Sequence, residues 1–302
     1  MAIRFDAGEV ITAMVTPFDA NREIDFNKAE ALTEHLVTTG TDTLLVAGTT
    51  GEGPTLTHEE EFELLSTIKR ANRNRAKVMM NAGSNSTDTA IQSAKWAEKE
   101  EVDGILSVVP YYNKPSQNGM IAHFSAIAEA TSLPIVIYNI PGRTGVNMLP
   151  TTVAKLAEKY ENIVGIKQSY ADMDAITEMK LLCPEDFAVY SGDDSLTLPM
   201  LSLGAYGVVS VASHILGTEM KSMIRNYKTG EIKAALNMHK KLYPAFKKLF
   251  MAPNPVPVKA ALDHFGIIKD YVRRPLVELT ADEKEELFSV IDKYTVAINH
   301  AG

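Results

Sequence analysis

Eight short apolar runs, rich in β-branched residues, constrain the fold of this 302-residue chain more than any other feature. They are typical of buried strands and lie at residues 10–15, 43–47, 77–82, 104–109, 134–140, 163–167, 187–191 and 207–211. Between successive runs lie stretches with helical periodicity, such as 27–38, 58–72, 87–100, 119–130, 150–159 and 193–203. The chain therefore alternates strand and helix over most of its length.

These runs are continuously apolar, as in PIVIYN at 134–139 and VVSVAS at 208–213. Continuous apolar strands are typical of a parallel sheet, because both of its faces are buried. Eight strand–helix units predict an α/β fold of the (β/α)8 or TIM-barrel type, and an open doubly wound sheet is the alternative. After the eighth run only helices are expected, at 219–228, 231–250, 256–265 and 281–298. We therefore predict a barrel catalytic domain at residues 1–226 and a C-terminal helical subdomain at 227–302.

The charge and cysteine content exclude several classes of partner. A net charge of -8 argues against nucleic acid, because phosphate binding depends on clustered Lys and Arg. The single cysteine, Cys183, forms no internal disulfide, which fits a reducing compartment and an inert packed thiol. No stretch approaches the roughly 18 uninterrupted apolar residues of a membrane span. We expect a cytoplasmic protein with no membrane partner.

The ends of the predicted strands carry polar side chains. In a barrel of this kind the active site lies at the carboxyl ends of the strands, so these residues are the candidates for chemistry. They are Thr49 and Thr50 after the second strand, Tyr112 after the fourth, Tyr138 and then Arg143 at the fifth, and Lys167 at the sixth.

Lys167 ends the apolar run that begins at Ile163. In a narrow, partly apolar barrel mouth, desolvation favours the neutral amine, which is a nucleophile. Its attack on a ketone gives an imine, which withdraws electrons and permits carbon–carbon bond formation beside the carbonyl. The alternative is a lysine that reaches solvent or pairs with a carboxylate.

The other candidates fit a site for a small keto acid. The segment from Gly48 to Glu52 offers two hydroxyls and backbone N–H groups in a turn, which suits a carboxylate, although an ordinary turn before a helix is the alternative. Tyr138 and Tyr112 are phenols able to transfer protons, and Arg143 is a bidentate partner for a second carboxylate. The seven histidines are scattered, so we expect neither a metal nor a cofactor.

Taken together, these motifs resemble the dihydrodipicolinate synthase family of the pyruvate-dependent class I aldolase superfamily, over nearly the whole chain. Their order and spacing make the resemblance specific. The segments that carry it are Gly48-Thr49-Thr50-Gly51-Glu52, Pro110-Tyr111-Tyr112-Asn113-Lys114-Pro115-Ser116-Gln117, Tyr138-Asn139-Ile140-Pro141-Gly142-Arg143-Thr144-Gly145, Gly165-Ile166-Lys167, Ser191-Gly192-Asp193-Asp194, Gly207-Val208-Val209-Ser210-Val211 and Pro253-Asn254-Pro255-Val256-Pro257-Val258-Lys259.

The resemblance implies a synthase that condenses pyruvate with L-aspartate 4-semialdehyde in the diaminopimelate and lysine pathway. It implies that Lys167 forms the Schiff base, that Tyr138 is the general acid and base, and that Thr49 and Tyr112 complete a proton relay. The implied substrate-binding residues are Thr50, Val209, Arg143 and Gly192. It also implies that Tyr112 reaches into a neighbouring subunit's site, in a homodimer or homotetramer.

Two other functions remain as alternatives. A sugar-acid aldolase of the same superfamily shares the turn and the lysine but lacks an arginine at the position of Arg143. A non-catalytic binding paralogue is disfavoured by the intact set of candidate catalytic residues. One departure from the family, Gln168-Ser169-Tyr170 in place of Glu and small residues, bears on substrate preference.

The resemblance also bears on regulation. Lysine-inhibited members bind lysine between subunits near the positions matching Gly53, Pro54, His58, Glu61, Asn85, Thr89 and Tyr111. Those members typically carry histidine at the position of Glu61 and glutamate at that of Thr89. The loss of an acidic partner for the lysine amino group, and the gain of a carboxylate, predict insensitivity to lysine.

Overall fold

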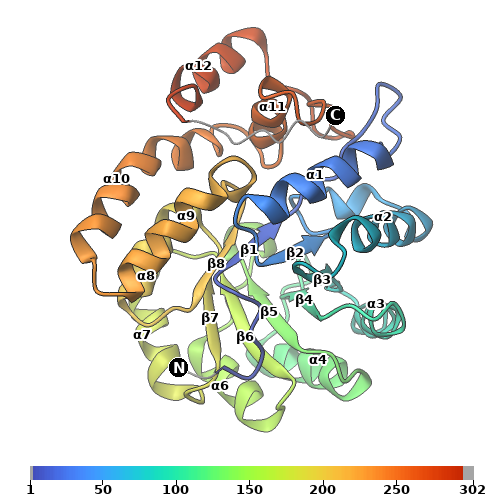
Figure 1. Cartoon of the computed structure of the whole chain (residues 1–302). Helices are drawn as coiled ribbons and strands as arrows, with labels where there is room; N and C mark the ends of the chain where they lie inside the picture. Colours follow the sequence, from blue (N-terminus) through green and yellow to red (C-terminus); the bar gives the residue numbers. More distant parts are fainter. Residues whose placement is uncertain (1–2, 295–302) are drawn as a thin grey trace. The chain divides into compact units, whose positions relative to one another are not determined.

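The chain forms eight parallel strands whose order in a closed barrel is β1-β2-β3-β4-β5-β6-β7-β8 (Figure 1). The structure is a computed structural model and describes residues 3–294. The strands are β1 (Val10–Ala13), β2 (Thr43–Val46), β3 (Lys77–Asn81), β4 (Gly104–Val108), β5 (Ile135–Asn139), β6 (Ile163–Gln168), β7 (Ala188–Ser191) and β8 (Gly207–Ser210). The predicted (β/α)8 barrel is confirmed, and the open doubly wound sheet is excluded.

Helices alternate with these strands, as predicted. They are α1 (Phe26–Thr38), η1 (Gly53–Thr55), α2 (His58–Asn72), α3 (Thr87–Lys99), α4 (Gln117–Ala130), α5 (Pro141–Thr144), α6 (Pro150–Lys159), α7 (Met173–Leu182), η2 (Asp194–Leu196) and α8 (Thr197–Ser202). The final helices are α9 (Ser213–Lys228), α10 (Ile232–Lys248), α11 (Val256–His264) and α12 (Ala281–Ile291). Residues 295–298 of the last predicted helix lie outside the described residues.

The chain divides into two compact units. One comprises Met1–Glu9 and Val78–Val209, and the other comprises Val10–Lys77 and Ser210–Gly302. The boundary between a catalytic domain and a helical subdomain after residue 226 stays a prediction.

In the first unit, the parallel ladder positions the candidate site. β5 pairs with β6 in a register that sets Tyr138 opposite Lys167, and β6 pairs with β7. Every residue of β5 and β6 is buried, as the continuous apolar runs predicted. A β-carbon at Gly165 would lie 2.6 Å from the Ala188 carbonyl oxygen, so only glycine permits this approach of the two strands.

In the second unit, β1 pairs with β2, and the helices α1 and α2 pack together, as do α9 and α10. α2 begins with a capping box in which Thr57 accepts a hydrogen bond from the Glu60 N–H and Glu60 accepts one from the Thr57 N–H. The turn between β2 and α2 is therefore anchored at both ends by regular structure. No helix within residues 3–294 is long and apolar enough to cross a membrane.

Candidate functional site

Lys167 and Tyr138 form the centre of the candidate site in the first unit. The Lys167 Nζ lies 4.1 Å from the centroid of the Tyr138 ring. Both side chains are buried, with 7% and 6% of their surface exposed. Within residues 3–294 Lys167 takes part in no ion pair, so the alternative of a carboxylate-paired lysine does not hold. A buried amine beside a phenol is suited to nucleophilic chemistry with proton transfer.

The backbone at Gly192 lies against the Lys167 side chain. A β-carbon there would stand 3.1 Å from the Lys167 Cγ and 1.8 Å from the Ser169 Oγ. The Ser169 hydroxyl donates a hydrogen bond of 3.2 Å to the Gly192 carbonyl oxygen. A larger residue at position 192 would therefore displace the Ser169 hydroxyl and crowd the Lys167 side chain.

Gln168, which departs from the family pattern, takes part in a buried hydrogen-bond network. Its Oε1 accepts a hydrogen bond of 3.0 Å from the Asn139 Nδ2. The Asn139 Oδ1 in turn accepts one from the Met148 N–H at 3.1 Å. These buried contacts fix the loop after β5, which includes the short helix α5 and Arg143.

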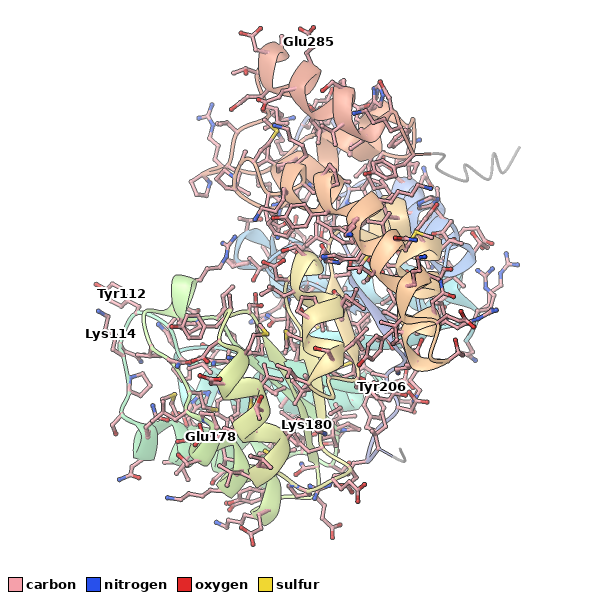
Figure 2. All side chains as sticks on the ribbon, turned by 90° about the vertical axis from the view of Figure 1, so that its left-hand side faces the viewer. Tyr112, Lys114, Glu178, Lys180, Tyr206 and Glu285 are labelled. Atoms are coloured by element: carbon pink, nitrogen blue, oxygen red, sulfur yellow. The ribbon has the colours of Figure 1, made fainter. Side chains whose placement is uncertain are left out.

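Arg143 and Tyr112 are both exposed. Within the described chain, no carboxylate pairs with the Arg143 guanidinium, which leaves its bidentate face available to a ligand. Tyr112 is 88% exposed and has a positive φ of 72°, and Figure 2 shows it pointing outward beside Lys114. A single chain therefore does not bury Tyr112 beside Tyr138 and Lys167. Val209, on β8, is buried with 2% exposed.

Thr49 and Thr50 lie in the turn after β2, in the second unit. The turn is closed by hydrogen bonds from the Glu52 N–H to the Thr49 carbonyl, at 3.1 Å, and from the Gly53 N–H to the Gly48 carbonyl, at 3.1 Å. Within residues 3–294 the backbone N–H groups of residues 49–51 have no acceptor. These N–H groups and the two threonine hydroxyls are the groups that would hold a carboxylate, and the carboxylate site itself stays a prediction.

The sequence did not reveal the side chains that hold this turn. The Asn254 Nδ2 donates a hydrogen bond of 2.9 Å to the Thr50 Oγ1. The Lys259 ammonium pairs with Glu52 at 2.5 Å, and both side chains are fully buried. Both Asn254 and Lys259 lie in the Pro-rich segment that carries the resemblance, and a lysine among apolar residues there was the available signal.

The cysteine and the possible metal-ligating side chains of the described residues add no further candidate site. Burial raises the pKa of the Cys183 thiol to about 11, which suits an inert thiol. No cluster of three His, Cys, Asp or Glu side chains that could hold a metal occurs within residues 3–294.

The chain forms a closed (β/α)8 barrel with a buried lysine at the end of β6. This arrangement fits the class of barrel enzymes that form a Schiff base with their substrate. The comparisons with known proteins specify the family. The model of the dihydrodipicolinate synthetase family matches residues 6–294, and the chain belongs to this family.

Individual relatives are similar to this chain along nearly its whole length. The 4-hydroxy-tetrahydrodipicolinate synthase of Bacillus subtilis is 52% identical over 95% of this chain and 99% of its own. The lysine-bound synthase structure from Cyanidioschyzon merolae is 46% identical, with a TM-score of 0.93 over 95% of this chain and 98% of its own. The chloride-inhibited synthase from Acinetobacter baumannii, complexed with pyruvate, is 36% identical, with a TM-score of 0.92 over 95% of this chain and 98% of its own.

Proposed function

We propose that this chain acts as a 4-hydroxy-tetrahydrodipicolinate synthase, which condenses pyruvate with L-aspartate 4-semialdehyde through an imine on Lys167. The observation that carries the proposal is the buried Lys167 amine, beside Tyr138 and without a carboxylate partner in the described chain. The relatives of known name support the choice of reaction.

In the proposed mechanism the Lys167 amine attacks the ketone carbon of pyruvate, and loss of water gives the imine. Loss of a methyl proton converts the imine into an enamine, whose carbon attacks the aldehyde of the second substrate. Tyr138, with its ring 4.1 Å from the lysine Nζ, is the group that gives and takes the protons. Thr49 and Tyr112 relay those protons to solvent.

The substrate carboxylates have separate partners in this proposal. The free N–H groups and hydroxyls of Thr49 and Thr50 receive the carboxylate of pyruvate. Arg143, exposed and unpaired within residues 3–294, receives the carboxylate of the semialdehyde. Val209 and Gly192 are the remaining residues that bind pyruvate in this proposal. Val209 offers a buried apolar side chain, and Gly192 leaves room beside the Lys167 side chain.

The decisive test of the imine is reductive trapping. Borohydride with pyruvate should add one reduced pyruvyl group to the wild-type chain, at Lys167, as intact and peptide mass measurements will show. Lys167→Ala should fold normally, take no label and lose nearly all activity. Lys180→Ala, which changes a partly buried lysine on α7, is the control and should label normally. Labelling at another lysine would remove the mechanism.

We further propose that the protein is a cytoplasmic homodimer or homotetramer in which Tyr112 serves the site of a second copy. The 88% exposure of Tyr112 supports this, since a lone chain leaves a large aromatic side chain in solvent. Mixing inactive Tyr112→Phe with inactive Lys167→Ala should restore activity, because one site of a mixed dimer then holds both native residues. Absence of complementation in proven mixed dimers would place Tyr112 in its own site.

A further inference from the structure

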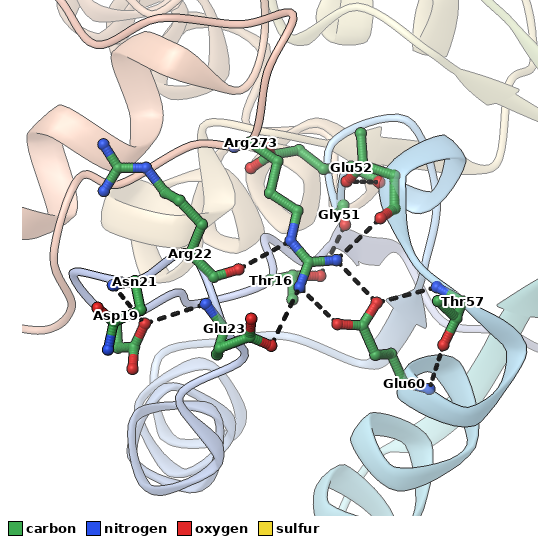
Figure 3. A network of polar contacts seen from close by, with 11 residues as sticks. Thr16, Asp19, Asn21, Arg22, Glu23, Gly51, Glu52, Thr57, Glu60 and Arg273 are labelled. Atoms are coloured by element: carbon green, nitrogen blue, oxygen red, sulfur yellow. Dashed lines mark hydrogen bonds and ion pairs between the residues drawn. The ribbon is translucent and has the colours of Figure 1, made fainter.

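The turn that carries Thr49 and Thr50 is fastened by a distant segment of its own unit. Arg273 donates hydrogen bonds from its backbone N–H to Glu52 at 2.8 Å, from its Nη1 to the Thr55 carbonyl at 2.8 Å, and from its Nε to the Arg22 carbonyl at 2.9 Å. Thr16 donates to the Gly51 carbonyl at 2.7 Å. Figure 3 shows the Arg273 side chain between Arg22, Glu52 and Glu60, with Thr16 beside Gly51.

Within this framework the hydrogen bond to the Thr50 hydroxyl has a defined direction. Thr50 is buried, and its Oγ1 accepts from the Asn254 amide at 2.9 Å. A hydroxyl has one donor and two acceptor positions, so its proton remains free for another partner. Within the described chain that proton has no acceptor, and the neighbouring N–H groups of residues 49–51 have none either.

The segment that carries Asn254 makes further contacts with the turn, while the Asn254 Oδ1 is buried without a hydrogen-bond partner within residues 3–294. The Lys259 ammonium, five residues further along, pairs with Glu52 at 2.5 Å and donates to the Tyr271 carbonyl at 2.8 Å. Its cation also lies 4.1 Å from the centroid of the Phe18 ring. The segment that presents Asn254 is thus tied to the same turn through a second, fully buried contact.

From this geometry we propose that Asn254 is a positioning residue for pyruvate binding, which fixes the Thr50 hydroxyl as a donor to a carboxylate held in the turn. This inference rests on the proposed function of the turn. A hydroxyl without the Asn254 contact is free to rotate and to present its oxygen lone pairs to the anion, which weakens binding. Asn254 acts only through Thr50, so its effect should fall on the Michaelis constant for pyruvate and disappear when the hydroxyl is absent.

The test is a double-mutant cycle at the two positions. Thr50→Val should raise the KM for pyruvate about tenfold, and Asn254→Leu should raise it several-fold, with kcat within about twofold. The double variant should bind pyruvate no worse than Thr50→Val alone. Asn237→Leu, which changes an exposed asparagine on α10 in the same unit, is the matched control and should leave KM unchanged.

A second variant covers the case in which Asn254→Leu does not fold. Asn254→Asp keeps the shape but accepts from the Thr50 hydroxyl when ionised, so the KM for pyruvate should rise tenfold or more at pH 8. At lower pH the protonated carboxyl donates, as the amide does, and the KM should recover, which a merely structural role would not produce.

The outcomes separate this inference from the proposed function. An unchanged KM in Thr50→Val would overturn the turn as the pyruvate site, and the inference with it. An impaired Thr50→Val together with unaffected Asn254 variants, or with multiplicative effects in the double variant, would overturn the inference alone. Borohydride trapping at saturating pyruvate should still label Lys167 in every folded variant, which shows that the imine chemistry is intact.

Discussion

The two units hold their candidate site residues by different means. In the first unit, Tyr138 and Lys167 are strand residues that face each other across a parallel ladder. In the second, Thr50 lies in an irregular turn that begins after Ala47 and ends with Glu52, both with positive φ. Repeated backbone hydrogen bonds fix the first pair, whereas a few polar side chains from distant segments fix the second.

This difference predicts which part tolerates change. A ladder residue keeps its place when one neighbour is altered, because many backbone hydrogen bonds hold the strand together. A turn held by buried polar contacts loses its place when one partner is removed, because the remaining group is left buried and unsatisfied. The turn should therefore be the more fragile of these two arrangements.

The largest effect is expected for Lys259→Met, which leaves the Glu52 carboxylate buried without its cation. Burial lowers the pKa of Lys259 to about 8 despite the attraction of Glu52, so the Lys259 amine is mainly charged at neutral pH. Breaking it should lower the free energy of unfolding by about 3–5 kcal/mol. Urea denaturation followed by circular dichroism measures this.

The control for that variant is Lys269→Met, which breaks the exposed pair between Lys269 and Asp263. Water screens an exposed pair, so its loss should change the free energy of unfolding little. The double change Lys259→Met with Glu52→Gln should recover part of the loss, because it removes the buried charge. Equal losses in Lys259→Met and Lys269→Met would show that the buried pair does not hold the turn.

In the first unit, Arg143→Ala should be milder and more selective. Arg143 is exposed, so the fold should survive, while the KM for the aldehyde rises by about 10- to 100-fold through loss of a bidentate partner. Trapping of pyruvate at Lys167 should persist. If this variant loses trapping but keeps its KM for the aldehyde, the role given to Arg143 is wrong.

The same contrast explains what the sequence predicts well. The eight strands and the place of Lys167 follow from local pattern, because a continuous apolar run identifies a strand buried on both faces. The sequence predicts a helix from residue 219, whereas α9 begins at Ser213 and contains the non-helical Leu216. Asn254 and Lys259 escaped prediction because their partners lie 204 and 207 positions away. A buried charge is interpretable only once its partner is known.

The acid stability of the second unit offers a smaller effect. The buried His214 donates from Nδ1 to the Val211 carbonyl at 2.8 Å and accepts at Nε2 from the Val15 N–H at 3.1 Å, so both nitrogens of the neutral ring are used. Desolvation lowers the pKa of His214 to about 4, and it also lowers the pKa of the nearby His35. The folded state therefore resists protonation that the unfolded chain accepts near pH 6.5.

Proton linkage sets the direction of this pH dependence. The contribution of neutral His214 to the free energy of unfolding is complete above pH 6.5 and is lost as the pH falls toward 4. The slope for His214 should approach about 1.4 kcal/mol per pH unit. His214→Asn should be less stable at neutral pH but should show a flatter decline on acidification. His58→Gln, which changes an exposed histidine, should keep the wild-type slope. Parallel slopes in all three proteins would assign the acid sensitivity to other groups.

The smallest expected effect concerns lysine, which should not inhibit this enzyme. In the second unit Glu61 is partly buried near His58, with 3.2 Å between its Oε2 and the histidine Nδ1, and desolvation raises its pKa against the pull of that histidine. A carboxylate already desolvated there disfavours the carboxylate of a bound lysine, and Thr89 offers the lysine ammonium no opposite charge. An ammonium that is taken out of water without a partner costs several kcal/mol, enough to abolish binding at millimolar lysine. The relative from Cyanidioschyzon merolae has been solved with lysine bound, so Glu61→His with Thr89→Glu, the residues typical of inhibited members, should introduce inhibition.

Initial rates with lysine titrated into the millimolar range test both proteins, with the single variant Glu61→His as the control for charge removal alone. Saturable inhibition of the wild type to a low plateau would show that these two positions do not govern the response, and that lysine binding tolerates a carboxylate at residue 61.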